Sequence, residues 1–504
     1  MTKTSHLTRL RRIIVRIVVA LAILYLLLLI PASQPPKVTA GERGPFAWSQ
    51  DEYWSTLEAR FKQARQIGCP QLVGRIDMNL SQLTQRIDSV ATDSLVPDAP
   101  VFPQIETGMF ELGVLMGACP DRLTDYVALH NRVREFVKRQ SRHWDMNSIL
   151  VRNRMYRLLY GGRAAVEEVM MQAPKAAVPS LILAQDEPSQ TPSAQILGVT
   201  IHSGDILLSR GGAPTSALIA RGNDYPGNFS HVALVHVDSN SGKVSIIESH
   251  IEKGVAVADI SQYLKDTKLR VMVLRLRSDL PMLVADPQLP HKAATAALAR
   301  AARGHIPYDF SMDFNDTTKL FCSEVASGAY AQFGVKLWMG LSHISGFGVK
   351  SWLSAFGVRH FETQEPSDLE YDPQLSVVAE WRDPETLFKD RVDNAIIDVL
   401  LERADSGMVL DYTWYMLPVA RVMKGYSMVL NAVNKTGPIP EGMDATAALR
   451  NDWFSKLHVR LKGRVLVLVD QFRQENGYMP PYWELVKLAR KAESEEASAN
   501  SGKS

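Results

Sequence analysis

The sequence predicts an α+β protein in which one β-rich module lies between two mainly helical regions. Short apolar runs between residues 205 and 277, separated by Gly, Asn and Ser, are typical of strands. The residues on both sides of this module carry apolar side chains at three- and four-residue spacing, which is typical of amphipathic helices. The chain has 504 residues, enough for about three domains.

Changes in composition along the chain predict where its parts begin and end. A segment rich in proline, serine and small residues, from residue 172 to 195, has the composition of a linker, so a new domain should begin near Gly198. The predicted parts are an N-terminal membrane anchor (1–38), a helical domain (45–172), the β-rich domain (198–362), a C-terminal helical region (367–490) and a disordered tail (491–504).

Charge and composition exclude several classes of protein. The chain has 56 Lys and Arg against 54 Asp and Glu, a net charge of +2, and no long basic tract, so we expect no nucleic-acid partner. An apolar content of 46% excludes a wholly disordered chain. Three cysteines are too few for a disulfide scaffold.

An apolar run near the start of the chain predicts a membrane helix. Residues 17–30 are uninterrupted apolar sequence, and residues 13–16 bring the stretch close to the length of a bilayer span. Most nearby positive charges precede or begin the run, which predicts a single-pass inner-membrane protein with a cytoplasmic N-terminus and a periplasmic main body. A cleaved signal peptide is the alternative, because the PAS sequence at 31–33 offers small residues where the run ends.

The cysteines fit an exported chain. Cys69 and Cys119 each precede a proline within one helical region, whereas Cys322 lies far along the sequence. We predict that Cys69 and Cys119 form a disulfide, as exported proteins allow. If the main body were cytosolic, two unpaired buried cysteines would be the better interpretation.

The β-rich module contains a candidate catalytic pair. Cys322 lies where a polar stretch meets a predicted helix, and a helix N-terminus favours thiolate over thiol. His231 begins a strand, and alternation along the next strand places Glu248 and His250 on one face, where either can orient His231. Thiol catalysis requires a base beside the sulfur and a polar group that fixes the imidazole. The alternatives are a buried structural cysteine, a hydrogen-bonded histidine and, for Glu248, an ion pair with an arginine.

Several short motifs together resemble a known family. The motifs are GDILLSR (204–210), SALIAR (216–221), NFSHVALVH (228–236), VSIIES (244–249), GHIPYDFSMDF (304–314) and LFCSEV (320–325). With these motifs, residues 203–360 resemble the circularly permuted papain-like hydrolases of the YiiX/YebB group in the NlpC/P60 superfamily. The histidine strand precedes the cysteine helix, as in this permuted group, whereas ordinary NlpC/P60 and papain-type enzymes have the reverse order.

The resemblance implies a permuted papain-like catalytic domain over 198–362 and a role for each matching residue. Cys322 is then the nucleophile, His231 the general base and later acid, and Glu248 the polar third member, with His250 as the alternative third member. Tyr308 and Asp309 match a Tyr-Asp pair that precedes the cysteine segment, where a supporting or substrate-facing role is implied.

The expected function is a membrane-anchored cysteine hydrolase of the amidase or peptidase type, acting through an acyl-enzyme on cell-wall peptides. One alternative is a lipid acyl hydrolase or acyltransferase at the membrane, and another is an inert papain-like scaffold. In each case the helical flanks are candidate surfaces for protein partners. We expect no cofactor, and no metal because the sequence has no His-Glu-x-x-His run and no paired Cys-x-x-Cys.

Overall fold

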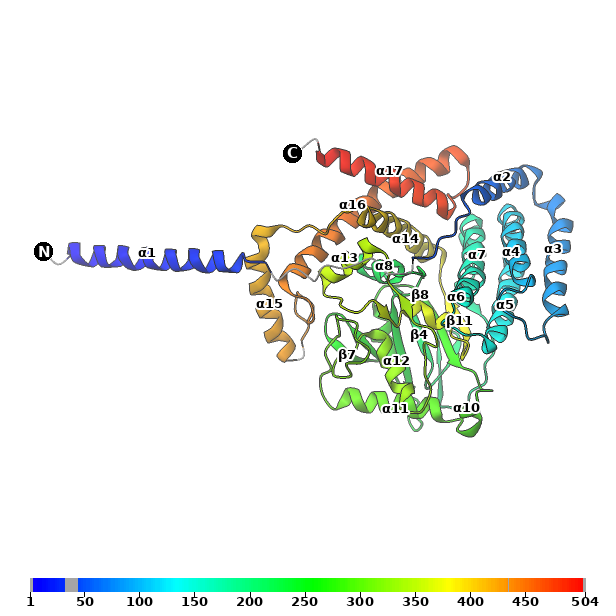
Figure 1. Cartoon of the computed structure of the whole chain (residues 1–504), viewed down its shortest axis with the longest axis horizontal. Coiled ribbons are helices and arrows are strands. Elements are labelled where there is room, and N and C mark those ends of the chain that lie inside the picture. The colour runs from blue at the N-terminus through cyan, green and yellow to red at the C-terminus, as the bar shows by residue number, and fades with distance from the viewer. Residues whose placement is uncertain (1–2, 32–43, 434, 502–504) are drawn as a thin grey trace.

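The computed structural model describes residues 3–31, 44–433 and 435–501 (Figure 1). Its centre is a seven-stranded antiparallel sheet in the order β1-β11-β8-β4-β5-β6-β7, and two small hairpins pair β2 with β3 and β9 with β10. The predicted α+β class is confirmed. The strands are β1 (Leu181–Leu183), β2 (Ser193–Ile196), β3 (Val199–His202), β4 (Ile206–Gly211), β5 (His231–Val237), β6 (Val244–His250), β7 (Gly254–Ala258), β8 (Lys268–Leu276), β9 (Ser342–His343), β10 (Glu362–Thr363) and β11 (Leu375–Trp381).

Both faces of the central sheet are covered, which explains the continuous apolar runs of its strands. On one face, Ile206 and Leu208 of β4 join a core with residues of α11 (Leu289–Ala302) and α12 (Cys322–Ala331). On the other face, Leu207 packs in a second core that includes Tyr263. Tyr263 lies on α9 (Ile260–Lys265), and the short α10 (Pro281–Ala285) precedes α11. The sheet therefore holds the residues at the start of β5 and α12 in a rigid frame.

The N-terminal helices form a bundle beside the sheet (Figure 1). Their apolar spacing buries one face of each helix; on α3, for example, Ile76, Leu83 and Ile87 enter the shared core. The bundle contains α2 (Asp51–Ile67), α3 (Cys69–Ser89), α4 (Val101–Ala118), α5 (Leu123–Gln140), α6 (Ile149–Met155) and α7 (Gly161–Gln172).

The C-terminal helices pack with two helices of the central module around a separate core. Trp352 and Phe454 meet edge to face in this core, with ring centroids 5.9 Å apart. The contributing helices are α8 (Pro214–Arg221), α13 (Phe347–Phe356), α14 (Pro384–Asp405), α16 (Ala445–Asn476) and α17 (Tyr482–Ser501), and α15 (Leu417–Ala432) packs beside α16.

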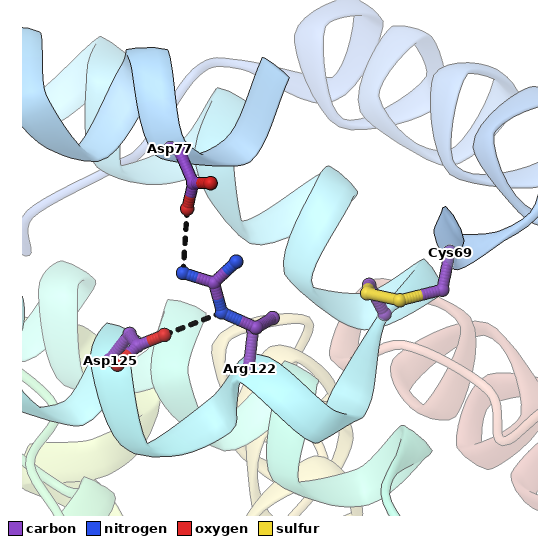
Figure 2. The surroundings of a disulfide bond; sticks show 5 residues. Cys69, Asp77, Arg122 and Asp125 are labelled. Carbon is purple, nitrogen blue, oxygen red and sulfur yellow. Dashed lines mark hydrogen bonds and ion pairs between the residues drawn. A yellow bond between two sulfur atoms is a disulfide. The ribbon is translucent and has the colours of Figure 1, made fainter. Parts of the chain in front are cut away.

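A disulfide joins two helices of the N-terminal bundle, which confirms the predicted pair. Cys69 begins α3 and Cys119 follows α4, and their Cα atoms lie 4.8 Å apart. Nearby, the Arg122 guanidinium donates to Asp77 at 2.7 Å and to Asp125 at 2.6 Å (Figure 2). These contacts hold α3 against the segment that enters α5.

A buried ion cluster attaches both helical regions to the sheet. Arg270 of β8 contacts Glu167 of α7 at 2.8 Å and Asp390 of α14 at 2.6 Å. Arg382, just after β11, contacts the same Glu167 at 2.8 Å. All four side chains are buried. Because a buried charge is costly without its partner, these contacts fix the three parts in one arrangement.

The predicted N-terminal transmembrane helix is wrong. None of the helices in the described part of the chain combines the length and the apolar character that a membrane crossing needs. The first helix, α1 (Lys3–Leu28), carries Arg11, Arg12 and Arg16, and only its residues 17–28 are uninterrupted apolar sequence. Twelve residues of helix extend about 18 Å, against a hydrocarbon thickness of about 30 Å. Part of the predicted anchor, residues 1–2 and 32–38, lies outside the described residues.

Two predicted boundaries also differ from the structure. Strand β11 pairs with β8 inside the central sheet, so the sheet continues past residue 362, and β1 adds a strand from the predicted linker. Residues 491–501 of the predicted disordered tail continue α17. Ala492 is fully buried there, and Glu496 pairs with Arg460 at 2.9 Å and with Arg464 at 2.7 Å. The polar composition of the tail hid this helix, because ion pairs hold it against α16.

Candidate active site

Cys322 is the first residue of α12, as the sequence predicted. Two contacts fix the chain just before it: the Leu320 N–H donates to the Pro307 carbonyl at 3.0 Å, and the Leu320 carbonyl accepts from Ser249 Oγ at 2.6 Å. Cys322 as a whole is 6% exposed. The first N–H groups of a helix have no partner within the helix, so they are directed toward the position of an anion at the sulfur.

His231 is the first residue of β5, the strand that α12 packs against. Its neighbour Ser230 places a carbonyl oxygen 4.0 Å from the Cys322 sulfur. A hydrogen bond between the Ser230 and Ser216 hydroxyls holds this turn, and Ser216 Oγ also accepts from the Gly211 N–H at 2.9 Å. The histidine and the cysteine, 91 positions apart in sequence, therefore meet at the junction of one strand and one helix.

Glu248 lies between two histidines. Its Oε2 is 2.9 Å from His231 Nε2, and its Oε1 is 3.0 Å from His250 Nε2. The carboxylate is 2% exposed, while both histidines are partly exposed. Because Nε2 of His231 is engaged with Glu248, Nδ1 is the nitrogen left to face the thiol. The two residues that the sequence offered as alternatives for the third position thus both lie beside His231: Glu248 pairs with its Nε2, and the His250 ring stacks on the His231 ring at 5.5 Å between centroids.

The charges of the cluster stabilise one another. Burial alone would lower the pKa of His231, but hydrogen bonds to Cys322 and Glu248 raise that pKa to about 10. Burial would raise the pKa of Glu248, but hydrogen bonds from His231 and His250 hold it well below its usual range. At neutral pH His231 is therefore an imidazolium that faces the sulfur, and Glu248 is a carboxylate.

The central third of the chain matches a known family. The matching family is described as permuted papain-like amidase enzyme, YaeF/YiiX, C92 family. The match covers residues 200–379, so this part of the chain is similar to the permuted papain-like domains of that family. No curated protein and no solved structure matches the chain.

The YaeF/YiiX match confirms the resemblance to the YiiX group and supports a hydrolase. It begins in β3 and ends within β11, so it includes the whole cluster around Cys322 and leaves the N-terminal bundle and helices α14–α17 outside.

Tyr308 and Asp309 occupy different environments near the cysteine. The pKa of Tyr308 is raised well above its ordinary value by burial and by the charge of Cys322, so the phenol lies within the field of the sulfur. Asp309 instead stabilises its own loop: it accepts from the Ser311 N–H at 2.9 Å and the Asp313 N–H at 2.7 Å. Tyr308 is thus near enough to Cys322 to feel its charge, whereas the hydrogen bonds of Asp309 hold the loop that follows it.

Two buried carboxyl groups near Cys322 were missed in the sequence. Burial raises the pKa of Glu365 well above its ordinary value, and the charges of Asp368 and Cys322 raise it further. Glu324, in the first turn of α12, accepts from the Phe321 N–H at 2.8 Å, and burial raises its pKa to about 8. Glu365 is distant from the cysteine in sequence and carries no motif signal. Glu324 follows Cys322 by two positions, but nothing in the sequence distinguishes it from an ordinary helix glutamate.

Among the residues that the structure describes, His231, Glu248 and His250 form a group that could hold a metal ion. The ligand atoms of His231, Glu248 and His250 lie within 4.8 Å of one another. Each oxygen of Glu248 already accepts from one of these histidines, so the three side chains also satisfy one another through hydrogen bonds. Two imidazoles and a carboxylate suit a transition-metal ion, and such an ion would compete with the pairing of His231.

Proposed function

We propose that the protein is a cysteine hydrolase of the amidase or peptidase type that acts through an acyl-enzyme. The observation that carries this proposal is the alignment of Cys322, His231 and Glu248 at the start of α12. A thiol at a helix N-terminus, an imidazolium beside it and a carboxylate behind the imidazole are the parts that thiol acyl transfer requires. An inert scaffold needs none of them, and the family match favours a hydrolase.

The proposed reaction has two steps. The Cys322 thiolate attacks the carbonyl carbon of an amide, and N–H groups at the start of α12 stabilise the negative oxygen. The C–N bond breaks as His231 Nδ1 gives its proton to the leaving amine. Water then attacks the thioester and loses a proton to His231. The products are a free carboxylic acid, the Cys322 thiolate and the His231 imidazolium. Glu248 keeps the imidazole oriented throughout.

Cell-wall peptides are the substrate class we propose, and acyl lipids are the alternative. The peptide proposal is supported by the amidase description of the family. The lipid alternative is supported by the exposed apolar helix α15, whose underlying core includes Phe310, and the Phe310 ring packs edge to face on Tyr308 at 5.1 Å. An acyltransferase would differ only in the second step, where an acceptor other than water takes the acyl group.

We also propose that the main body works in an oxidising compartment such as the periplasm. The Cys69–Cys119 disulfide supports this, because such bonds persist where thiols are not kept reduced.

Thiol labelling tests the proposal. An acylating thiol probe should label the full-length protein at Cys322 at neutral pH, and His231→Ala should slow this labelling strongly. Cys322→Ala should abolish it, while His143→Ala, a change at an exposed histidine of the N-terminal bundle, should leave the rate unchanged. A Cys322 that reacts at the rate of an ordinary thiol, regardless of His231, would favour the inert scaffold. Peptide amides and acyl esters can then be compared as substrates.

A further inference from the structure

Helix α15 exposes its apolar side chains on the face that points away from the protein. We call this the α15 face: Val419, Val422, Met423, Tyr426, Val429 and Val433. Their spacing of three and four residues makes one continuous stripe along the helix and the residue after it. Five of the six are between 49% and 65% exposed, and Met423 is 36% exposed.

The opposite side of α15 is the side that packs. Leu417, Ala420 and Ser427 are buried, against a small core that contains Ile439 and Met443. An ordinary surface helix turns its apolar stripe inward and its polar residues outward. In α15 the inner side buries Leu417 and Pro418 at its start but only Ala420 and Ser427 further along, while most of the large apolar residues lie on the outer side, so this face is built to contact something other than water.

The charges and aromatic residues around the α15 face indicate what it contacts. Between Asp411 and Glu441 the sequence has no acidic residue, while Arg421, Lys424 and Lys435 are basic. Trp414 and Tyr415, just before the helix, are 63% and 56% exposed. Exposed apolar side chains flanked by Trp and Tyr, with only basic charges on the helix itself, are typical of helices that lie in the surface of an anionic bilayer.

The apolar surface continues beyond α15. In Figure 1 α15 lies across the end of α1, and the Arg421 guanidinium donates to the carbonyl oxygens of Leu27, at 3.3 Å, and Ile30. Tyr25 donates to the Tyr415 carbonyl at 3.3 Å. Leu24, Leu26 and Leu27 of α1 are themselves more than half exposed. The patch is therefore wider than one helix.

We propose that the α15 face binds the surface of an anionic lipid bilayer, with the helix lying in the plane of the interface. The occupant is lipid rather than a protein because the charged residues on the helix itself are basic and exposed aromatic residues border the apolar stripe. This proposal goes beyond the hydrolase assignment and does not depend on it. If it holds, the contact brings the domain that carries Cys322 to the membrane surface, through the core that Phe310 shares with α15.

A probe placed on the α15 face tests the contact directly. Val429→Cys is introduced into the full-length chain together with Cys322→Ala, so that the engineered thiol is the one that reacts with an environment-sensitive dye. The matched control carries Val96→Cys, because Val96 is 62% exposed and Val429 is 65% exposed, and Val96 belongs to the distant N-terminal bundle. Both are mixed with phosphatidylcholine vesicles, with and without phosphatidylglycerol, some of which carry a lipid-borne quencher.

We expect the dye at position 429 to shift to the blue and to be quenched by the lipid, more strongly with phosphatidylglycerol and less at high salt. The dye at position 96 should not respond, and the pair Val422→Asp and Val429→Asp should weaken vesicle binding on the order of tenfold relative to Val96→Asp. No response at 429, or equal responses at 429 and 96, would overturn the proposal. A blue shift that grows with protein concentration without vesicles would also overturn it, because a second copy would then cover the face.

Discussion

Replacing Glu248 with glutamine should move the alkaline limit of activity. The glutamine can still accept from His231 Nε2 at the 2.9 Å position and donate to His250, so the substitution removes charge and keeps the shape. The pKa of His231 is about 10 in the parent. An opposite charge at this range is worth about 1–3 pKa units, each equal to about 1.4 kcal/mol. The pKa of His231 should therefore fall by about that amount.

The consequence for the reaction follows from the role of His231 as the acid for the leaving group. Activity is retained while His231 is protonated and is lost as the pH rises through its pKa, so the descending limb of kcat/KM should move from about 10 toward neutrality. The assay is a pH profile of kcat/KM for hydrolysis of an amide, whose leaving amine needs this proton. Glu475→Gln, at an exposed position of α16, is the matched control. An unchanged limb in Glu248→Gln would refute the proposed link between Glu248 and His231.

Three further predictions concern stability and metal. Glu167→Gln should lower the free energy of unfolding by about 3–5 kcal/mol in urea denaturation, because it leaves Arg270 short of a buried partner; exposed Glu52→Gln should change it little. Cys69→Ser with Cys119→Ser should lower that free energy by about 2–4 kcal/mol, since the bond closes a loop of 50 residues; an equal stability with and without reductant would contradict this. EDTA should leave the rate of Cys322 labelling unchanged. A labelling rate that falls with EDTA and recovers with zinc would instead indicate that His231, Glu248 and His250 bind a metal ion.

The strands that carry the site could be predicted because their limits are marked in the sequence. His231–Val237 follows a YPGN turn and forms β5 as predicted, and alternation along β6 correctly placed Glu248 and His250 on one face. The position of Cys322 at a helix start was also visible, as a polar stretch before a run of small residues. These are local signals, so one sequence suffices to find them.

What could not be predicted depends on contacts distant in sequence. Glu365 follows Cys322 by 43 positions, and only the fold brings it close enough for the charge of Cys322 to raise its pKa. The helix over residues 491–501 is held by contacts with α16, such as Arg460 with Glu496, that its composition does not reveal. The prediction of a transmembrane helix failed for a different reason. The apolar run reaches a spanning length only if it is counted through the charged Arg16. The exposure of the apolar stripe on α15 could not be predicted either, because periodicity identifies an apolar stripe but not whether it faces the core or the solvent.

The central claim is that Cys322 is a nucleophile activated by His231, and the acyl-enzyme tests it most directly. Intact-protein mass spectrometry after brief exposure to an activated acyl ester should show one added acyl group, localised to Cys322 and absent in Cys322→Ala. His231→Ala should form it far more slowly at neutral pH. A protein that gains no acyl group, or gains it equally without His231, would contradict the account.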